Sequence, residues 1–221
     1  MRYHFLPITS VVLFLSGFAG NVAAEPFDLR GSKLGMTLSE FRTLPHPDGK
    51  SDKVICEGDS EYARASSVIS DISEDEKIAG ATICRHFARD KSGSWRQARL
   101  NVATTDLPVE FRFIRDPMHS NEPALYKISV MTGTSDWDKL LEGYTTKYGN
   151  PTRRSDSPIQ NMAGATFDNI EAVWENEEST ITLIKRDKRI NEGRVSYVHK
   201  PLWEEIRRKV EEKQGRPSDK L

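Results

Sequence analysis

Alternation between apolar and polar residues recurs along this chain, and it constrains the fold more than any other feature of the sequence. A period of two with one polar face is typical of strands in an antiparallel sheet that is packed on one side. In the strand predicted at 125–131, Tyr126, Ile128 and Val130 are expected to share the buried face. The other predicted strands are residues 54–56, 81–87, 97–104 and 110–115, and three more segments between residues 170 and 197.

Two amphipathic helices with clear end signals interrupt these strands. Thr37 and Glu40 have the spacing of a capping box, and Pro45 ends the short helix that this box begins. The longer helix is expected to begin after an N-cap at Ser135 and to end at Gly149. Its apolar stripe, at helical spacing, consists of Trp137, Leu140, Leu141, Tyr144 and Tyr148.

A third helix is predicted from Pro201, since proline is well tolerated in the first helical turn. Leu202, Ile206 and Val210 recur on one side of this helix, and we expect that side to pack on the sheet. Together the elements predict an α+β fold, an antiparallel sheet with helices on one face. Their order also allows two related helix-and-meander units, residues 25–132 and 133–214, followed by a flexible tail at 215–221.

The first 24 residues have the pattern of a secretory signal peptide. Arg2 precedes a mostly apolar run at 6–18, and Val22 and Ala24 occupy the small-residue positions of a cleavage site. The run is shorter than the ~20 residues that span a bilayer. We therefore expect export to the periplasm, cleavage after Ala24 and no membrane span in the mature chain.

Cys56 and Cys84 are the two cysteines of the chain, and both belong to the predicted exported part. A cysteine pair in an oxidising compartment predicts one disulfide. The pair has neither the C-x-x-C spacing of redox sites nor the ligand spacing of structural zinc sites. We therefore expect a structural bond, and no metal or other cofactor.

Residues 35–41, Gly-Met-Thr-Leu-Ser-Glu-Phe, resemble the helix start of the SmpA/OmlA outer-membrane assembly lipoproteins and of the tandem-repeat β-lactamase-inhibitor-protein fold. Residues 141–151 and the strands after them are similar to these families in layout. The resemblance implies a helix followed by an antiparallel meander, and a role in envelope assembly or enzyme inhibition. The chain differs in lacking a lipobox cysteine and in carrying extra strands in its first unit. More broadly, it is similar to exported proteins of Gram-negative bacteria.

Two short motifs would suit a hydrolase. Gly58-Asp59-Ser60 resembles the nucleophile block of the GDS-type esterases, and Asp116-Pro117-Met118-His119 resembles their Asp-x-x-His block. A serine nucleophile with a histidine base is the arrangement used for acyl transfer. However, no strand–helix–strand alternation surrounds these motifs. A small periplasmic serine hydrolase using Ser60 and His119 is therefore the alternative hypothesis.

The remaining polar clusters have simpler interpretations. Asp71, Ser73, Asp75 and Glu76 lack the glycine and the distal glutamate of a calcium loop, so we expect a solvated acidic loop. The histidines after the signal peptide have no metal-ligand spacing. A basic turn and an aromatic residue of the last helix are the candidates for partner binding: Lys185, Arg186, Lys188, Arg189 and Trp203.

The charge balance argues against a nucleic-acid-binding protein. Lys and Arg number 32 and Asp and Glu 33, whereas such proteins usually have a basic excess. Neighbouring residues form no phosphate loop, metal-ligand pattern or catalytic cluster. We therefore predict a non-catalytic, soluble periplasmic protein that binds a ligand or another envelope protein.

Overall fold

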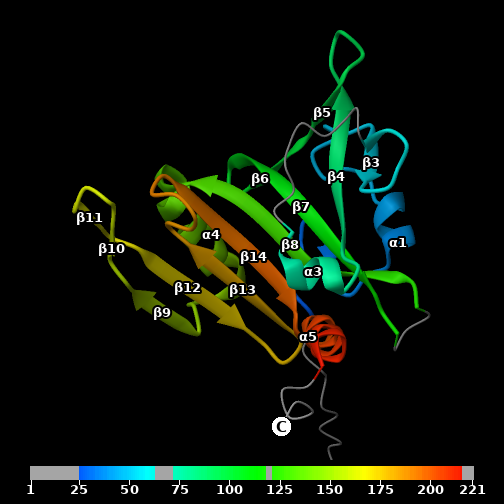
Figure 1. Ribbon diagram of the computed structural model, residues 1–221. Coiled ribbons are helices and arrows are strands. Elements are labelled where there is room, and N and C mark those ends of the chain that lie inside the picture. The colour runs from blue at the N-terminus through cyan, green and yellow to red at the C-terminus, as the bar shows by residue number, and fades with distance from the viewer. Residues whose placement is uncertain (1–24, 63–71, 118–120, 216–221) are drawn as a thin grey trace, which may run out of the picture.

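The computed structural model describes residues 25–62, 72–117 and 121–215 (Figure 1). The predicted signal peptide, residues 1–24, lies outside the described residues, as do residues 216–221 of the predicted tail. Within the described ranges, no helix is both long enough and apolar enough to cross a membrane.

One antiparallel sheet of ten strands forms the body of the molecule (Figure 1). Its order is β3-β4-β7-β8-β14-β13-β12-β9, with β5 paired to β4 and β6 paired to β7. Because β8 pairs with β14, the segments 25–132 and 133–214 contribute to a single continuous sheet. The strands are β3 (Lys53–Cys56), β4 (Thr82–Arg89), β5 (Trp95–Gln97), β6 (Arg99–Val102), β7 (Thr105–Arg115), β8 (Pro123–Gly133), β9 (Arg153–Asp156), β12 (Ile170–Glu175), β13 (Ser179–Ile184) and β14 (Glu192–His199).

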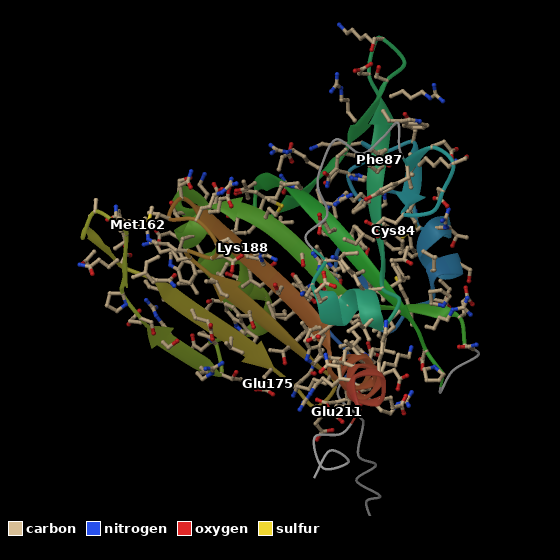
Figure 2. All side chains as sticks on the ribbon, viewed as in Figure 1. Cys84, Phe87, Met162, Glu175, Lys188 and Glu211 are labelled. Carbon is tan, nitrogen blue, oxygen red and sulfur yellow. A yellow bond between two sulfur atoms is a disulfide. The ribbon has the colours of Figure 1, made fainter. Side chains whose placement is uncertain are left out.

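Two small hairpins form separate two-stranded sheets. The first pairs β1 (Asp28–Leu29) with β2 (Ser32–Lys33). The second pairs β10 (Ile159–Gln160) with β11 (Thr166–Phe167), and it projects beyond the sheet at the left of Figure 1. Met162 lies at its tip, far from Phe87 on β4 (Figure 2).

The predicted α+β class and antiparallel sheet are confirmed, but the helices divide between both faces of the sheet instead of sharing one. The helices α1 (Leu38–Thr43) and α4 (Trp137–Tyr148) cover one face, which we call the α4 face. The helices α3 (Glu74–Ile78) and α5 (Lys200–Gln214) lie on the other, the α5 face (Figure 1). Each face has its own apolar cluster, because strands such as β8 carry large apolar side chains on both sides.

A β-bulge explains why one predicted strand face is wrong. Arg112 pairs with Lys127 and Phe113 with Leu125, so Tyr126 is an extra residue in β8. Tyr126 therefore points to the α5 face, away from the face of Ile128 and Val130. There it packs with Leu202, Ile206 and Ala79, and its ring stacks on Trp203 with 6.3 Å between ring centroids.

The predicted helix signals are largely confirmed. Thr37 and Glu40 form a capping box at the start of α1. Gly149 is the C-cap of α4, and Leu202 and Ile206 of α5 pack on the sheet as expected. The N-cap predicted at Ser135 is wrong, because a 3-10 turn, η1 (Thr134–Asp136), precedes α4. The N-cap is Asp136.

The predicted disulfide is confirmed in its pairing. Cys56 and Cys84 lie directly opposite each other on β3 and β4, with 2.02 Å between their sulfur atoms. Both residues are buried, and the bond joins the ends of the excursion at 57–83 that carries α3.

Gly143 allows the turn between β6 and β7 to pack on the middle of α4. A Cβ atom at Gly143 would lie 2.6 Å from the Cβ atom of Ala103. Alanine normally stabilises a helix by about 1 kcal/mol relative to glycine. Here we expect Gly143→Ala to lower the free energy of unfolding by about 1–3 kcal/mol, because the turn must move or strain. Urea denaturation measures this, with Thr146→Ala on the exposed side of α4 as the control; a stabilised Gly143→Ala would contradict the prediction.

Candidate functional site

Four charged side chains form a buried ionic network on the α5 face. Arg85 on β4 contacts Glu110 on β7 at 2.5 Å, and the other carboxylate oxygen of Glu110 accepts from Arg112 at 3.0 Å. Arg112 in turn contacts Glu76 of α3 at 2.8 Å. The strand pleat places Arg85, Glu110 and Arg112 on this face, since Cys84 and Phe111 face the other core.

Glu76 corrects the expectation of a solvated acidic loop. Ser73 and Glu76 form a capping box that begins α3, and Glu76 is only 1 % exposed. Its carboxylate accepts from the Tyr126 hydroxyl at 2.8 Å and lies 3.3 Å from Nζ of Lys127. Asp71 lies outside the described residues. The acidic stretch therefore docks a helix on the sheet through a buried carboxylate.

The titration properties of the network indicate fixed charges. Burial raises the pKa of Glu76, but Lys127 and Arg112 outweigh it and hold this pKa at about 2. Burial also raises the pKa of Glu110, which Arg85 and Arg112 lower below its usual value. Neither carboxylate is therefore poised to exchange a proton near neutral pH. The network suits a rigid support better than acid–base chemistry.

Beside this network the α5 face is hollowed into a groove. Two adjoining hollows, of about 270 and 370 Å³, share Arg99, Pro108 and Met131. The smaller one reaches Gln97 and Glu110, so it borders the ionic network directly. We call the two together the Met131 groove; besides these five residues its lining includes Thr105, Asp106, Leu107, Thr132, Gly133, Asp136, Asp187, Glu192, Gly193 and Arg194.

An exposed apolar side chain and an available cation lie side by side in the Met131 groove. Met131 is 42 % exposed, although it belongs to a central strand. Arg99 is exposed and forms no ion pair within 4 Å with any residue that the structure describes. By contrast, Arg194 contacts Asp187 at 2.7 Å. The groove can therefore offer an apolar contact and a guanidinium to the same ligand.

The basic turn predicted to bind a partner borders the Met131 groove, since Asp187 and Glu192 line it, but Trp203 lies apart from this turn. Lys185 and Arg186 both pair with Asp168, and Arg189 contacts Glu192 at 2.8 Å. Lys188 is exposed at the turn before β14 (Figure 2). Trp203 lies beyond the other end of β14, on α5, where Nζ of Lys127 is 5.6 Å from its ring centroid.

The residues of the alternative hydrolase hypothesis are described only in part. The Ser60 hydroxyl donates to the carboxylate of Glu61 at 3.0 Å. Asp59 accepts from the backbone N–H of Cys56 at 2.8 Å and pairs with Arg42. His119 lies outside the described residues, so the Ser60–His119 pair stays a prediction.

Metal-ligating side chains are dispersed in the part of the chain that the structure describes, where no three of His, Cys, Asp and Glu gather as a metal site. His46 and His86 meet edge to face, with 4.9 Å between ring centroids. Burial, together with the nearby His46, lowers the pKa of His86 to about 4. His86 is therefore a neutral core residue at physiological pH, packed on Phe41 and Phe111.

Comparisons with models of known protein families, with curated proteins and with solved structures gave no match.

Sequence reasoning missed the Met131 groove, although one signal was available. Met131 is an apolar residue at a position of β8 where the period of two predicts a polar one. Its neighbours Arg99 and Pro108 come from another hairpin, and their proximity requires the strand pairing.

Proposed function

We propose that this chain is a non-catalytic, soluble periplasmic protein that binds another envelope protein through the Met131 groove. The observation that carries the proposal is the exposed Met131 beside the exposed Arg99, in a hollow on a central part of the sheet. Met and Arg are both enriched at protein interfaces, and few apolar side chains this large are exposed on the described surface.

The lining of the groove indicates the chemistry of the partner segment. An apolar side chain would contact Met131 and Pro108, which share both hollows. A neighbouring carboxylate would pair with Arg99, because a guanidinium presents donors that match a carboxylate. We therefore expect a loop or strand of another protein that carries an acidic residue next to an apolar one.

The surroundings of the groove favour binding without large rearrangement. The ionic network fixes Glu110 at one end of the groove through Arg85 and Arg112. The groove floor belongs to β7 and β8, which are held by neighbours on both sides. A preformed site loses less conformational entropy on binding than a flexible one. The family resemblance supports the same class of function, since assembly factors and enzyme inhibitors both act by protein contact.

Photo-crosslinking in intact cells tests the proposal. A photoreactive amino acid is placed at Met131, and Glu211, exposed on α5 and outside both hollows, serves as the control position (Figure 2). We expect a crosslinked adduct in the periplasmic fraction from position 131 and none from position 211. Arg99→Glu in the position-131 protein should abolish this adduct, because it repels the expected carboxylate. An adduct that survives Arg99→Glu, or no adduct at all, would overturn the proposed partner site.

The hydrolase hypothesis is tested with the same protein preparation. Wild-type protein and Ser60→Ala are assayed for hydrolysis of short acyl esters. The non-catalytic proposal predicts the same background rate for both. A measurable rate that is lost in Ser60→Ala would instead favour the enzyme.

A further inference from the structure

A second pocket lies on the α4 face, away from the Met131 groove. Its volume is about 130 Å³, and it opens between α4, the β6–β7 turn and the β1–β2 turn. Its walls include Leu29, Val102, Ala103, Tyr144, Tyr148 and Tyr197, and we call it the tyrosine pocket. We propose that the tyrosine pocket binds a small organic carboxylate whose apolar body is about the size of a benzene ring.

Two tight hairpin turns form part of this pocket. Among the described residues, four non-glycine residues have a positive φ, and two of them, Arg30 (φ 53°) and Ala103 (φ 45°), line the pocket. A third, Thr104 (φ 69°), is adjacent in the same turn. These residues belong to the two-residue turns of the β1–β2 and β6–β7 hairpins, where both central positions require a positive φ. The packing of Ala103 against Gly143 fixes the β6–β7 turn on α4.

The tyrosines give the pocket apolar walls. The hydroxyls of Tyr144 and Tyr197 bond each other at 2.7 Å, and the Tyr148 hydroxyl donates to the carbonyl of Asp28 at 2.9 Å. Burial raises the pKa of Tyr144 and Tyr197, so both remain neutral phenols. Because their hydroxyls are engaged with protein groups, the rings supply aromatic surface to a ligand.

Two cations stand at the rim. Lys147 Nζ lies 3.1 Å from a carboxylate oxygen of Asp28 and 4.8 Å from the ring centroid of Tyr148. Arg30 contacts Asp48 at 2.7 Å. Both cations line the pocket. Lys147 and its partner Asp28 are both largely exposed, so Lys147 can exchange Asp28 for a ligand carboxylate at small cost. Arg30 stays paired, because Asp48 is only 13 % exposed.

The volume of the pocket limits the apolar body of the ligand. A protein cavity of about 150 Å³ accommodates benzene. The tyrosine pocket has nearly this volume and is open on one side, so a single ring or a short branched chain would fill it while its carboxylate stays at the rim. Benzoate is therefore the probe.

An NMR titration with benzoate tests the proposal on the mature chain. We expect saturable shifts of backbone amides around Ala103, Gly143 and Lys147. Benzyl alcohol, which has the ring without the charge, should bind there about fivefold more weakly, the effect of losing one exposed ion pair. The absence of saturable shifts, or shifts centred elsewhere, would overturn the proposal.

Two pairs of variants locate the site. Ala103→Leu should fill the pocket and abolish benzoate binding, whereas Thr104→Leu, at the next left-handed position, should leave it unchanged. Lys147→Met should remove the preference for benzoate over benzyl alcohol, whereas Lys139→Met, exposed on the same helix, should keep it. Circular dichroism confirms folding of each variant. Benzoate binding by a folded Ala103→Leu protein equal to wild type would refute the site.

Discussion

Glu76→Gln is expected to lower the free energy of unfolding by about 3–5 kcal/mol, the cost of leaving a buried ion without its partner. Arg112 keeps only 2 % of its side chain exposed, and Glu76 contacts it with both carboxylate oxygens at 2.8 and 2.9 Å. Glutamine preserves the shape of Glu76 but removes its charge. Glu110 still faces Arg112, which places the effect nearer the lower limit. Urea denaturation followed by tryptophan fluorescence measures it.

The matched control is Glu74→Gln on the same helix. Glu74 is exposed and pairs with Lys77, and such pairs contribute about 0–1 kcal/mol. The double variant Glu76→Gln/Arg112→Met should cost less than the sum of its single variants, because removing the cation removes the uncompensated charge. If Glu74→Gln and Glu76→Gln lowered the free energy of unfolding equally, the buried pair would contribute no more stability than the exposed one.

The contribution of Glu76 also depends on pH in a defined direction. Its pKa in the folded protein is about 2, below the value of 4.5 expected of a free glutamate. The unfolded chain therefore binds the proton first as pH falls, and the stabilisation is complete above about pH 4.5 and is lost towards pH 2. The difference in stability between wild type and Glu76→Gln should shrink over this window. The buried His86 titrates in both proteins, so its effect cancels in the difference.

The helices and strands could be predicted because their signals are local. The period of two found β4, β7 and β8, and the capping box at Thr37 found α1. The face of Tyr126 could not be predicted in this way. Counting alternate residues assumes uninterrupted pairing, and the bulge in β8 arises from its register with β7. The bulge also helps α5 to pack on the second face of the sheet, because it adds Tyr126 to the apolar cluster beneath α5.

The candidate site was harder to predict because its residues meet through the topology. Ser73 and Glu76 have the same capping-box spacing as Thr37 and Glu40, so the start of α3 was accessible from the sequence. The burial of Glu76 was not, because Arg112 lies 36 positions further along the chain. Arg99 and Met131 likewise meet only through the pairing of β6 with β7 and of β7 with β8.

Removing the disulfide should cost about 3–4 kcal/mol of stability. Cys56 and Cys84 are separated by 28 positions. A crosslink that closes a loop of that length lowers the conformational entropy of the unfolded chain, which stabilises the folded state by about this amount. The variant Cys56→Ala/Cys84→Ala removes the bond and avoids free thiols. Its unfolding in urea should also show a larger dependence on denaturant, because an unfolded chain without the crosslink exposes more surface.

Reductant provides the control for this prediction. Both sulfur-bearing residues are buried, so a thiol reductant should act slowly on the folded wild type and rapidly in denaturant. Reduced wild-type protein should then approach the urea midpoint of Cys56→Ala/Cys84→Ala, whereas the variant itself should not respond to reductant.

The segment 57–83 should remain docked without the disulfide. The strands at its ends, β3 and β4, pair with each other, and Glu76 holds α3 within it. A variant that has lost its antiparallel sheet signal in circular dichroism would contradict this account.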